Sequence, residues 1–307
     1  MLAPAVSPEE MKRVKGLGFL HNRGTDRFSA RIITVNGKVT AAQLARIAEA
    51  SERFAGGEVT FTARLTVEVP GVPFDQIEPF REFIAPAGLE TGGTGPKVRP
   101  VVACKGTTCQ FGLIDTFALA GKIHARFYTG YRQVTLPHKF KIAVGGCPNN
   151  CVKPDLNDVG VMGQRIPGYD ASRCRGCGVC AVEKTCPVGA ARVADGVLGI
   201  DGARCNYCGR CIGKCPFGAL ETGTAGYTVM IGGRWGKEAN RGTPLKTVLT
   251  SEAEVLDAIE SAILLFREQG RPGERFASMI NRLGFDAVQD ELLSGRPLGR
   301  KAAILAS

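Results

Sequence analysis

The stretch 136–151, LPHKFKIAVGGCPNNC, joins two lysines to two cysteines through a short apolar run. Lys139 and Lys141 are two positions apart, so in a strand both side chains point to one face and the phenylalanine between them packs behind. Cys147 and Cys151 follow on a Cys-Pro turn, and two thiolates at this spacing suit an iron–sulfur cluster. The stretch therefore predicts an anion-binding strand that leads into half of a cluster site. The alternative is a surface strand with exposed lysines and two buried thiols.

A second pair of cysteines completes this cluster site. The segment Arg99–Cys104, RPVVAC, predicts a short strand that delivers one thiol, and Cys109 follows in a C-x4-C spacing. With Cys147 and Cys151 this makes four thiols in two loops, which is enough for one [4Fe–4S] cluster.

The other eight cysteines form two similar runs, C-x2-C-x2-C-x5-C-P and C-x2-C-x2-C-x3-C-P. This duplication is the signature of bacterial two-cluster ferredoxins, in which the fourth cysteine of each run ligates the other cluster. One predicted cluster takes Cys174, Cys177, Cys180 and Cys215, and the other takes Cys205, Cys208, Cys211 and Cys186. Zinc is the alternative, but zinc sites use pairs of C-x2-C rather than triplets closed by Cys-Pro. The runs predict an inserted module over residues 166–224.

The first part of the chain has a strand–helix–strand–helix order that predicts a small ferredoxin-like half-domain. Strands are expected at Arg27–Val35 and Glu58–Val69, and helices at 40–54 and 74–83. The first helix begins at a capping box, Thr40-Ala-Ala-Gln43. Arg31 and Arg64 lie on the two expected strands, and spacing alone leaves a salt bridge or snorkelling as the alternative to a functional role.

The segment after the module begins with a predicted strand, Tyr227–Ile231, followed by the loop GGRWG. Gly232 and Gly233 allow backbone N–H groups to approach an anion, and Arg241 adds charge nearby, so we predict that this loop contacts a cofactor. An ordinary strand–loop turn is the alternative. Two helices are expected at 251–270 and 274–283, the first opened by a capping box.

Composition limits the class of protein. The 307 residues are 44% hydrophobic and could form two domains or one with an insertion. No run approaches the length of a membrane span, and the N-terminus lacks the apolar core of a signal peptide, so a cytoplasmic protein without a membrane partner is expected. The formal net charge of +10 would suggest nucleic acid. Three clusters with thiolate ligands remove roughly 6 of these charges, so we expect the excess to face cofactors and an anionic substrate.

Five motifs together resemble the siroheme-containing nitrite and sulfite reductases. They are FSARIITVNGKVTAAQLARIAEA, FTARLTVEV, KVRPVVACKGTTCQFG, LPHKFKIAVGGCPNNC and YTVMIGGRWG. The chain is most similar to the catalytic subunit of the anaerobic, dissimilatory-type sulfite reductases, and some relatives carry a ferredoxin insertion in the same place. The resemblance implies an α+β fold: a half-domain at 1–92, a siroheme and [4Fe–4S] domain at 93–165 and 225–307, and the ferredoxin module at 166–224.

The resemblance also implies roles for individual residues. The cluster on Cys104, Cys109, Cys147 and Cys151 would be coupled to siroheme, with Cys151 bridging the cluster and the siroheme iron. Arg31, Arg99, Lys139 and Lys141 match the basic residues around the substrate. Arg64 matches an arginine that binds the siroheme carboxylates. One departure is the C-x4-C pair, since the more familiar spacing is C-x5-C.

The function implied is six-electron reduction of sulfite to sulfide, with electrons passing through the module to the coupled cluster and siroheme. Reduction of nitrite to ammonia is one alternative, and a non-catalytic electron carrier is another. No Rossmann-type nucleotide motif is visible, so a separate flavoprotein, ferredoxin or donor subunit is expected. We also expect a homodimer or larger assembly whose active sites are built from two chains. The alternative is a fold-back at the Gly-Gly pair that lets one chain build its own site.

Overall fold

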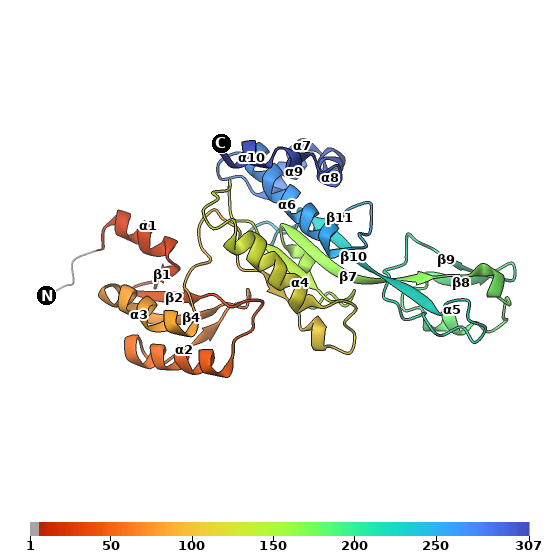
Figure 1. Ribbon diagram of the computed structural model, residues 1–307, viewed down its shortest axis with the longest axis horizontal. Coiled ribbons are helices and arrows are strands. Elements are labelled where there is room, and N and C mark those ends of the chain that lie inside the picture. Colours follow the sequence, from red (N-terminus) through yellow and green to blue (C-terminus); the bar gives the residue numbers. More distant parts are fainter. Residues whose placement is uncertain (1–5, 307) are drawn as a thin grey trace. The chain divides into compact units, whose positions relative to one another are not determined.

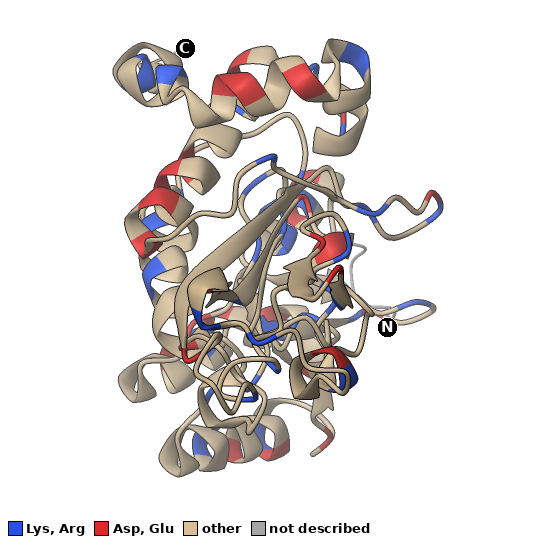
Figure 2. Cartoon of the chain, turned by 90° about the vertical axis from the view of Figure 1, so that its right-hand side faces the viewer, with Lys and Arg blue, Asp and Glu red and all other residues tan. Residues whose placement is uncertain are grey.

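The computed structural model describes residues 6–306, which divide into two compact units (Figure 1). The first unit contains the chain up to Ala103 together with Ala120–Ala143 and the segment from Glu260 onward. The second unit contains Cys104–Leu119 and Val144–Ile259. Basic and acidic residues are interspersed along the helices (Figure 2). Within residues 6–306, no helix is long and apolar enough to cross a membrane.

The first unit begins with the expected half-domain. Its strands are β1 (Phe19–His21), β2 (Arg27–Ile32), β3 (Thr60–Phe61) and β4 (Val67–Pro73), in the order β1-β2-β4-β3 and antiparallel throughout. Its helices are α1 (Pro8–Gly16), α2 (Ala41–Phe54) and α3 (Ile77–Ile84). Helices α2 and α3 lie on the same side of the sheet in Figure 1, and one core of buried aliphatic and aromatic side chains joins the helices to the strands. Burial of this apolar surface is the main term that stabilises the half-domain.

Helix α2 confirms the capping box. The Thr40 hydroxyl accepts the Gln43 N–H, and the Gln43 side chain accepts the Thr40 N–H, at 3.1 and 3.0 Å. These two contacts satisfy donors that the first helical turn otherwise leaves without partners. Ile47, Ala50 and Phe54 form the buried face of the helix.

The predicted second strand, Glu58–Val69, is wrong. The structure breaks it into β3 and β4 with a tight turn between them, where Leu65 has a positive φ of 60°. Hydroxyls hold this turn, because Thr62 Oγ1 lies 2.7 Å from Thr66 Oγ1 and accepts the Thr66 N–H at 3.2 Å. Arg64 therefore lies at the tip of a hairpin rather than on a strand.

The rest of the first unit packs around aromatic rings. Phe140 is fully buried against Phe266 and Phe276, with ring centroids 5.8 and 5.2 Å away. This confirms that Phe140 packs behind the two lysines. The C-terminal helices are α6 (Glu252–Gln269), which belongs to this unit from Glu260 onward, and α7 (Phe276–Leu283), α8 (Phe285–Leu293), α9 (Arg296–Gly299) and α10 (Lys301–Ala306). The expected helices at 251–270 and 274–283 match α6 and α7, and the last three helices were not predicted.

Glu260 is a buried carboxylate in this unit, with its side chain 1% exposed. It pairs with Arg126, accepts the Tyr131 hydroxyl, and lies 2.7 Å from Lys301 Nζ. Burial alone would raise the pKa of Glu260, but these three donors together lower it.

We expect Glu260→Gln to destabilise the folded protein by about 1–3 kcal/mol at pH 7, because it weakens a charge-assisted network around a buried hydroxyl. A lowered folded-state pKa contributes stability above the ordinary pKa of glutamate, and this contribution is lost as the pH falls through the folded-state pKa. Urea unfolding at pH 7 and near pH 4 should show the deficit shrinking at the lower pH. The control is Glu49→Gln at an exposed glutamate. Equal stability of wild type and Glu260→Gln at pH 7 would contradict the network.

The second unit is built on two long strands. β7 (Val159–Gly168) and β10 (Thr222–Ile231) pair antiparallel over their full length, from Val159 opposite Ile231 to Gly168 opposite Thr222. β11 (Thr243–Pro244) pairs with β10, and the sheet continues on the other side of β7 with Val144 and Gly145, the last residues of β6 (Ile142–Gly145). In the first unit β5 (Val102–Ala103) follows Arg99, which agrees with the short strand expected there. Helix α4 (Thr116–Ile123) follows the first cysteine pair.

The cysteine-rich segment lies between β7 and β10. It contains α5 (Ala181–Thr185) and a hairpin of β8 (Ala191–Ala194) and β9 (Val197–Ile200), which Figure 1 shows beyond the far ends of β7 and β10. Its small core consists of Val182, Ala191, Leu198 and Leu220, with five cysteines packed against it. A core this small needs additional stabilisation, which the predicted metal ligation would supply.

Candidate functional site

A cavity of about 270 Å³ in the first unit brings five basic side chains together. Its lining consists of Arg31, Thr62, Ala63, Arg64, Thr66, Gly93, Arg99, Pro100, Lys139 and Lys141. All four residues predicted to surround the substrate line it, as does the predicted siroheme anchor. The two threonines that hold the hairpin turn were missed in the sequence, where their T-x3-T spacing was the available signal.

Arg99 is the most constrained cation of the cavity. Its Nη1 donates to the Gly93 carbonyl, and its buried Nε has no hydrogen-bond partner among residues 6–306. Burial first, and then the positive charges of Arg31 and Arg275, lower the pKa of Arg99 to about 10. A cation destabilised in this way is stabilised when an anion enters the cavity.

Arg31 is paired. Its Nε and Nη2 lie 2.8 and 2.7 Å from Glu68 Oε1, and its Nη1 donates to the Gly93 carbonyl at 3.3 Å. The salt bridge left open as an alternative is therefore present. Because Glu68 offsets the charge of Arg31, its guanidinium contributes less attraction for an anion than Arg99 does.

Arg64 reaches from the hairpin tip to main chain far away in sequence. Its Nη2 donates to the carbonyls of Pro100 and Ile142 at 2.7 and 3.3 Å. These contacts bring the Thr62–Thr66 turn to the segments that hold Arg99 and Lys141. The structure thus gives Arg64 a positioning role that sequence spacing did not show.

Lys139 and Lys141 precede β6 rather than lie within it. Both side chains are half-buried and line the same cavity, so the expected common face is present. Phe140 sets this geometry, since it pairs with Val98 in an isolated parallel bridge and points into the core. The Lys139 N–H donates to His138 Nδ1 at 2.7 Å.

The second unit gathers the first four cysteines. Burial raises the pKa of Cys147, and the neighbouring thiols of Cys104, Cys151 and Cys109 raise it further. The Gly146 N–H donates to Cys104 Sγ at 3.1 Å, a contact that stabilises thiolate ligands. A Cβ on Gly146 would lie 2.9 Å from Gly106 Cα, so only glycine lets the two loops approach this closely. These four side chains fit one iron–sulfur cluster.

The other eight cysteines are predicted to form two sets, and seven of them have neighbours that agree with this division. Burial raises the pKa values of Cys205 and Cys211, and Cys208 and Cys186 raise both further. Burial first, and then the thiols of three cysteines of the other predicted set, raise the pKa of Tyr169 to about 12. Those three are Cys174, Cys180 and Cys215. Backbone N–H groups point at Sγ of Cys174, Cys186 and Cys205. The donors fit two clusters with exchanged fourth ligands.

Cys177 completes the first of these sets in sequence and lies between Cys174 and Cys180. A single ion requires ligands within about 2.3 Å of one point, whereas a four-iron cluster spreads its thiolates over four irons. Within residues 6–306, no three His, Cys, Asp or Glu side chains are grouped tightly enough to hold a single metal ion.

The GGRWG loop has contacts within its own unit. A Cβ on Gly233 would lie 2.3 Å from the Asp155 and Asn157 carbonyls, and the Gly232 N–H donates to the Asp158 carbonyl at 3.0 Å. Arg241 pairs with the buried Asp155 carboxylate. Close packing explains Gly233, and a positive φ of 82° explains Gly232. A cofactor role for Gly232, Gly233 and Arg241 stays a prediction.

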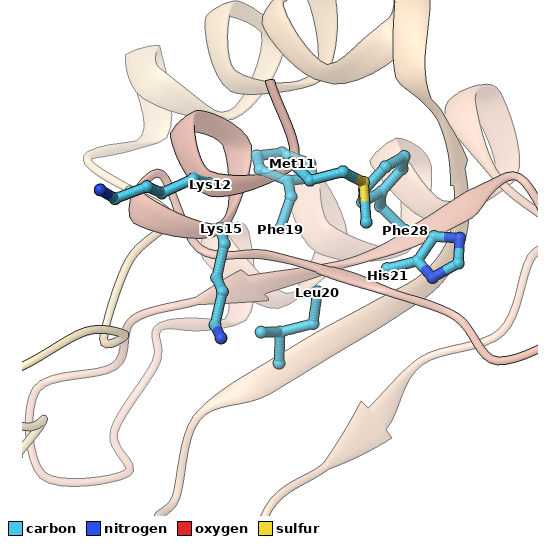
Figure 3. Close-up of a pocket in the computed structure, with 7 residues that line it drawn as sticks. All are labelled: Met11, Lys12, Lys15, Phe19, Leu20, His21 and Phe28. Carbon is cyan, nitrogen blue, oxygen red and sulfur yellow. The ribbon is translucent and has the colours of Figure 1, made fainter. Parts of the chain in front are cut away.

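A separate cavity of about 500 Å³ lies between α1 and β1 (Figure 3). Figure 3 shows the Met11 sulfur beside Phe28, while the ammonium groups of Lys12 and Lys15 point away from the rings. None of the predicted site residues lines this cavity. It is not part of the candidate site.

Two family models match the chain. The model described as "Nitrite and sulphite reductase 4Fe-4S domain" matches residues 94–301, and the model described as "Nitrite/Sulfite reductase ferredoxin-like half domain" matches residues 21–87. The first model covers more than half of the 307 residues.

Three curated proteins illustrate the similarity. The chain is 32% identical over 253 residues to the coenzyme F420-dependent sulfite reductase of Methanocaldococcus jannaschii, covering 81% of this chain and 39% of that protein. It is 27% identical to the alpha subunit of the dissimilatory-type sulfite reductase of Allochromatium vinosum, covering 80% and 64%. It is 29% identical to one subunit of the anaerobic sulfite reductase of Salmonella typhimurium, covering 52% and 49%. The chain thus spans less than two thirds of each of these relatives.

Solved structures show the same fold. The crystal structure of dissimilatory sulfite reductase I superposes with a TM-score of 0.68 at 23% identity, over 87% of this chain and 69% of that chain. Mycobacterium tuberculosis NirA superposes with a TM-score of 0.66 at 16% identity, over 96% of this chain and 48% of that chain.

Proposed function

Because this chain belongs to the nitrite and sulphite reductase family, we propose that it is the catalytic chain of a siroheme-dependent sulfite reductase. The reaction is the six-electron reduction of sulfite to sulfide. The observation that carries the proposal is the cavity in which Arg31, Arg99, Lys139 and Lys141 converge. A small oxyanion is the ligand class that such a group of cations binds.

The residues that line the cavity are proposed to have different roles. Arg99, Lys139 and Lys141 offset the charge of sulfite and donate hydrogen bonds to its oxygens. The lysine ammonium groups also hold protons at Nζ beside oxygens that leave as water. Arg31 is held by Glu68 and fixes one wall of the cavity.

Siroheme, when bound, supplies the metal that coordinates the substrate and the electrons that reduce it. Cys104, Cys109, Cys147 and Cys151 would hold the coupled cluster, with Cys151 as the shared ligand. Arg64 would bind siroheme carboxylates, a role consistent with a guanidinium fixed by main-chain contacts. The visible spectrum of the purified protein tests this assignment, because siroheme bands that shift with sulfite separate the enzyme from a plain iron–sulfur carrier.

Replacing Arg64 with alanine is expected to lower the siroheme content of the purified protein, because a carboxylate anchor and the Pro100 and Ile142 contacts are lost together. Siroheme is measured by its extracted absorbance per chain, and Arg53→Ala, at an arginine stacked on the half-domain ring of Phe83, is the control. Normal siroheme occupancy in Arg64→Ala would reject the role.

Electrons are proposed to enter through the module at 166–224 and to pass to the coupled cluster and siroheme. We expect about 13 iron atoms per chain, from three four-iron clusters and one siroheme iron. Iron analysis of anaerobically purified protein with full siroheme measures this number. A value near 9, from two clusters and the siroheme iron, would mean that one cluster is missing and would break the proposed path.

The active site is proposed to be shared between two chains in a symmetric dimer. Lys141 and Cys147 are separated by β6, and a strand advances about 3.3 Å per residue, so one copy of this segment holds its lysines and its thiols far apart along the chain. A two-fold axis supplies two equivalent sites, each with the cysteines of one chain and the basic residues of the other.

A further inference from the structure

The cysteine-rich module has its own cavity, of about 510 Å³, along the hairpin of β8 and β9. It is lined by Gly189, Ala190, Arg192, Ala194, Val197, Leu198, Gly199, Ile200, Asp201 and Arg204. None of these residues belongs to the site described above. We call this surface the hairpin face.

The floor of the hairpin face is main chain that contacts both predicted cluster sites. The Ala190 N–H donates to Cys186 Sγ at 3.2 Å, and the Leu198 N–H donates to Cys174 Sγ at 3.5 Å. The two cysteines belong to different predicted clusters. An electron that arrives at this floor is therefore one hydrogen bond away from a ligand of either cluster.

The side chains of Arg192 and Arg204 lie close together on the hairpin face. A Cβ on Gly189 would lie 3.7 Å from Arg204 Nη2 and 3.9 Å from Arg192 Nη2, so both guanidinium groups lie over the same point. Neither arginine forms an ion pair with a carboxylate in the described part of the chain, although Asp201 lines the same cavity and accepts the Ala203 N–H at 2.9 Å. Two like charges that converge repel each other unless an anion lies between them.

The remaining surface suits a protein better than a small molecule. Val197 is 49% exposed at the tip of the hairpin, and Arg192, Ala194 and Gly199 are exposed around it. An exposed apolar residue beside two neighbouring cations is typical of a small surface that binds another protein transiently. We propose that the hairpin face docks the acidic surface of an electron-donor protein, whose carboxylates bind Arg192 and Arg204. This inference rests on the proposed function only in that the module takes up electrons.

The step is a single electron transfer. A reduced [2Fe–2S] centre in the donor loses one electron and becomes oxidised, and an oxidised [4Fe–4S]2+ cluster of the module gains it and becomes [4Fe–4S]1+. No proton is transferred, and no bond forms or breaks.

The test uses the holo chain and a reduced, acidic [2Fe–2S] ferredoxin as the probe. Stopped-flow absorbance follows cluster reduction, at low and at high salt, without sulfite. In Arg192→Glu/Arg204→Glu the second-order rate at low salt should fall by about tenfold or more, and most of its salt dependence should disappear. Lys184→Glu, exposed on α5 outside the hairpin face, should stay close to the wild type. Reduction by the methyl viologen radical, which is a cation, should not slow in any variant.

Other outcomes overturn the proposal. One is a double variant that reacts with ferredoxin as fast as Lys184→Glu at low salt, at unchanged iron content. Another is phosphate binding that depends on the two arginines while ferredoxin rates do not, which would mark a small-anion site. If the double variant loses iron, Arg192→Gln/Arg204→Gln is measured in the same way. The experiment measures cluster reduction and not sulfite turnover. Its result therefore remains valid even if the chain does not reduce sulfite.

Discussion

Lys139→Ala and Lys141→Ala are each expected to lower kcat/KM for sulfite by about 2–4 kcal/mol, roughly 30- to 1,000-fold, while siroheme and clusters are retained. Both side chains line the basic cavity, and each substitution removes one charged donor from the oxyanion. Phe140 keeps its place in the core in both variants, so the fold of this segment should persist. Steady-state rates with a viologen donor measure the loss.

Lys97→Ala is the matched control. Lys97 belongs to the same unit, and its Nζ donates to the Arg132 carbonyl at 2.7 Å, outside the basic cavity. It should retain near wild-type rates. If Lys139→Ala or Lys141→Ala kept near wild-type rates with both sulfite and nitrite, the substrate role of that residue would be wrong.

A mixed dimer of Cys151→Ser and Lys139→Ala chains is expected to recover about half of the wild-type activity, although the Cys151→Ser homodimer is inactive and the Lys139→Ala homodimer keeps at most a few per cent. If each site takes its thiols from one chain and its lysines from the other, one site receives both defects and its neighbour receives none. Differently tagged chains, co-expressed and purified through both tags, give the mixed dimer for the activity assay.

Active sites that are each built from a single chain predict a different activity for the mixed dimer. When one chain supplies both thiols and lysines, every site in the mixed dimer carries one defect, and activity stays near zero. That result, obtained with full cluster content on the Lys139→Ala chain, would disprove shared sites and favour the fold-back at Gly145-Gly146. Mixing Lys139→Ala with Lys141→Ala is the control, because in a shared-site dimer each site then keeps one defect.

Local patterns in the sequence predicted much of this molecule. The capping box at Thr40 uses contacts only three residues long, and the structure forms both of them. The cysteine sets follow from fixed spacings, and the thiols that influence one another in the structure fall within the predicted sets. Lys139 and Lys141 share a face because the residue between them is pulled into the core.

Features that depend on contacts distant in sequence were not predictable. The alternation in Glu58–Val69 resembles one long strand, yet Thr62 and Thr66 close a turn through a hydroxyl pair and Leu65 adopts a positive φ. Glu68, the partner of Arg31, comes beside it only through the pairing of β2 with β4. The carbonyls that hold Arg64 lie 36 and 78 residues away. The motifs that carry the family resemblance therefore identified the basic residues but not which of them has a carboxylate partner.

The central claim is that this chain reduces sulfite at siroheme, and product stoichiometry tests it most directly. Purified holo protein is mixed anaerobically with reduced methyl viologen and limiting sulfite, and sulfide and oxidised viologen are both quantified. We predict one sulfide for each sulfite and about six viologen electrons per sulfide, with a higher kcat/KM for sulfite than for nitrite. Siroheme-loaded protein that forms no sulfide, or that reduces nitrite to ammonia with the higher kcat/KM, would contradict the account.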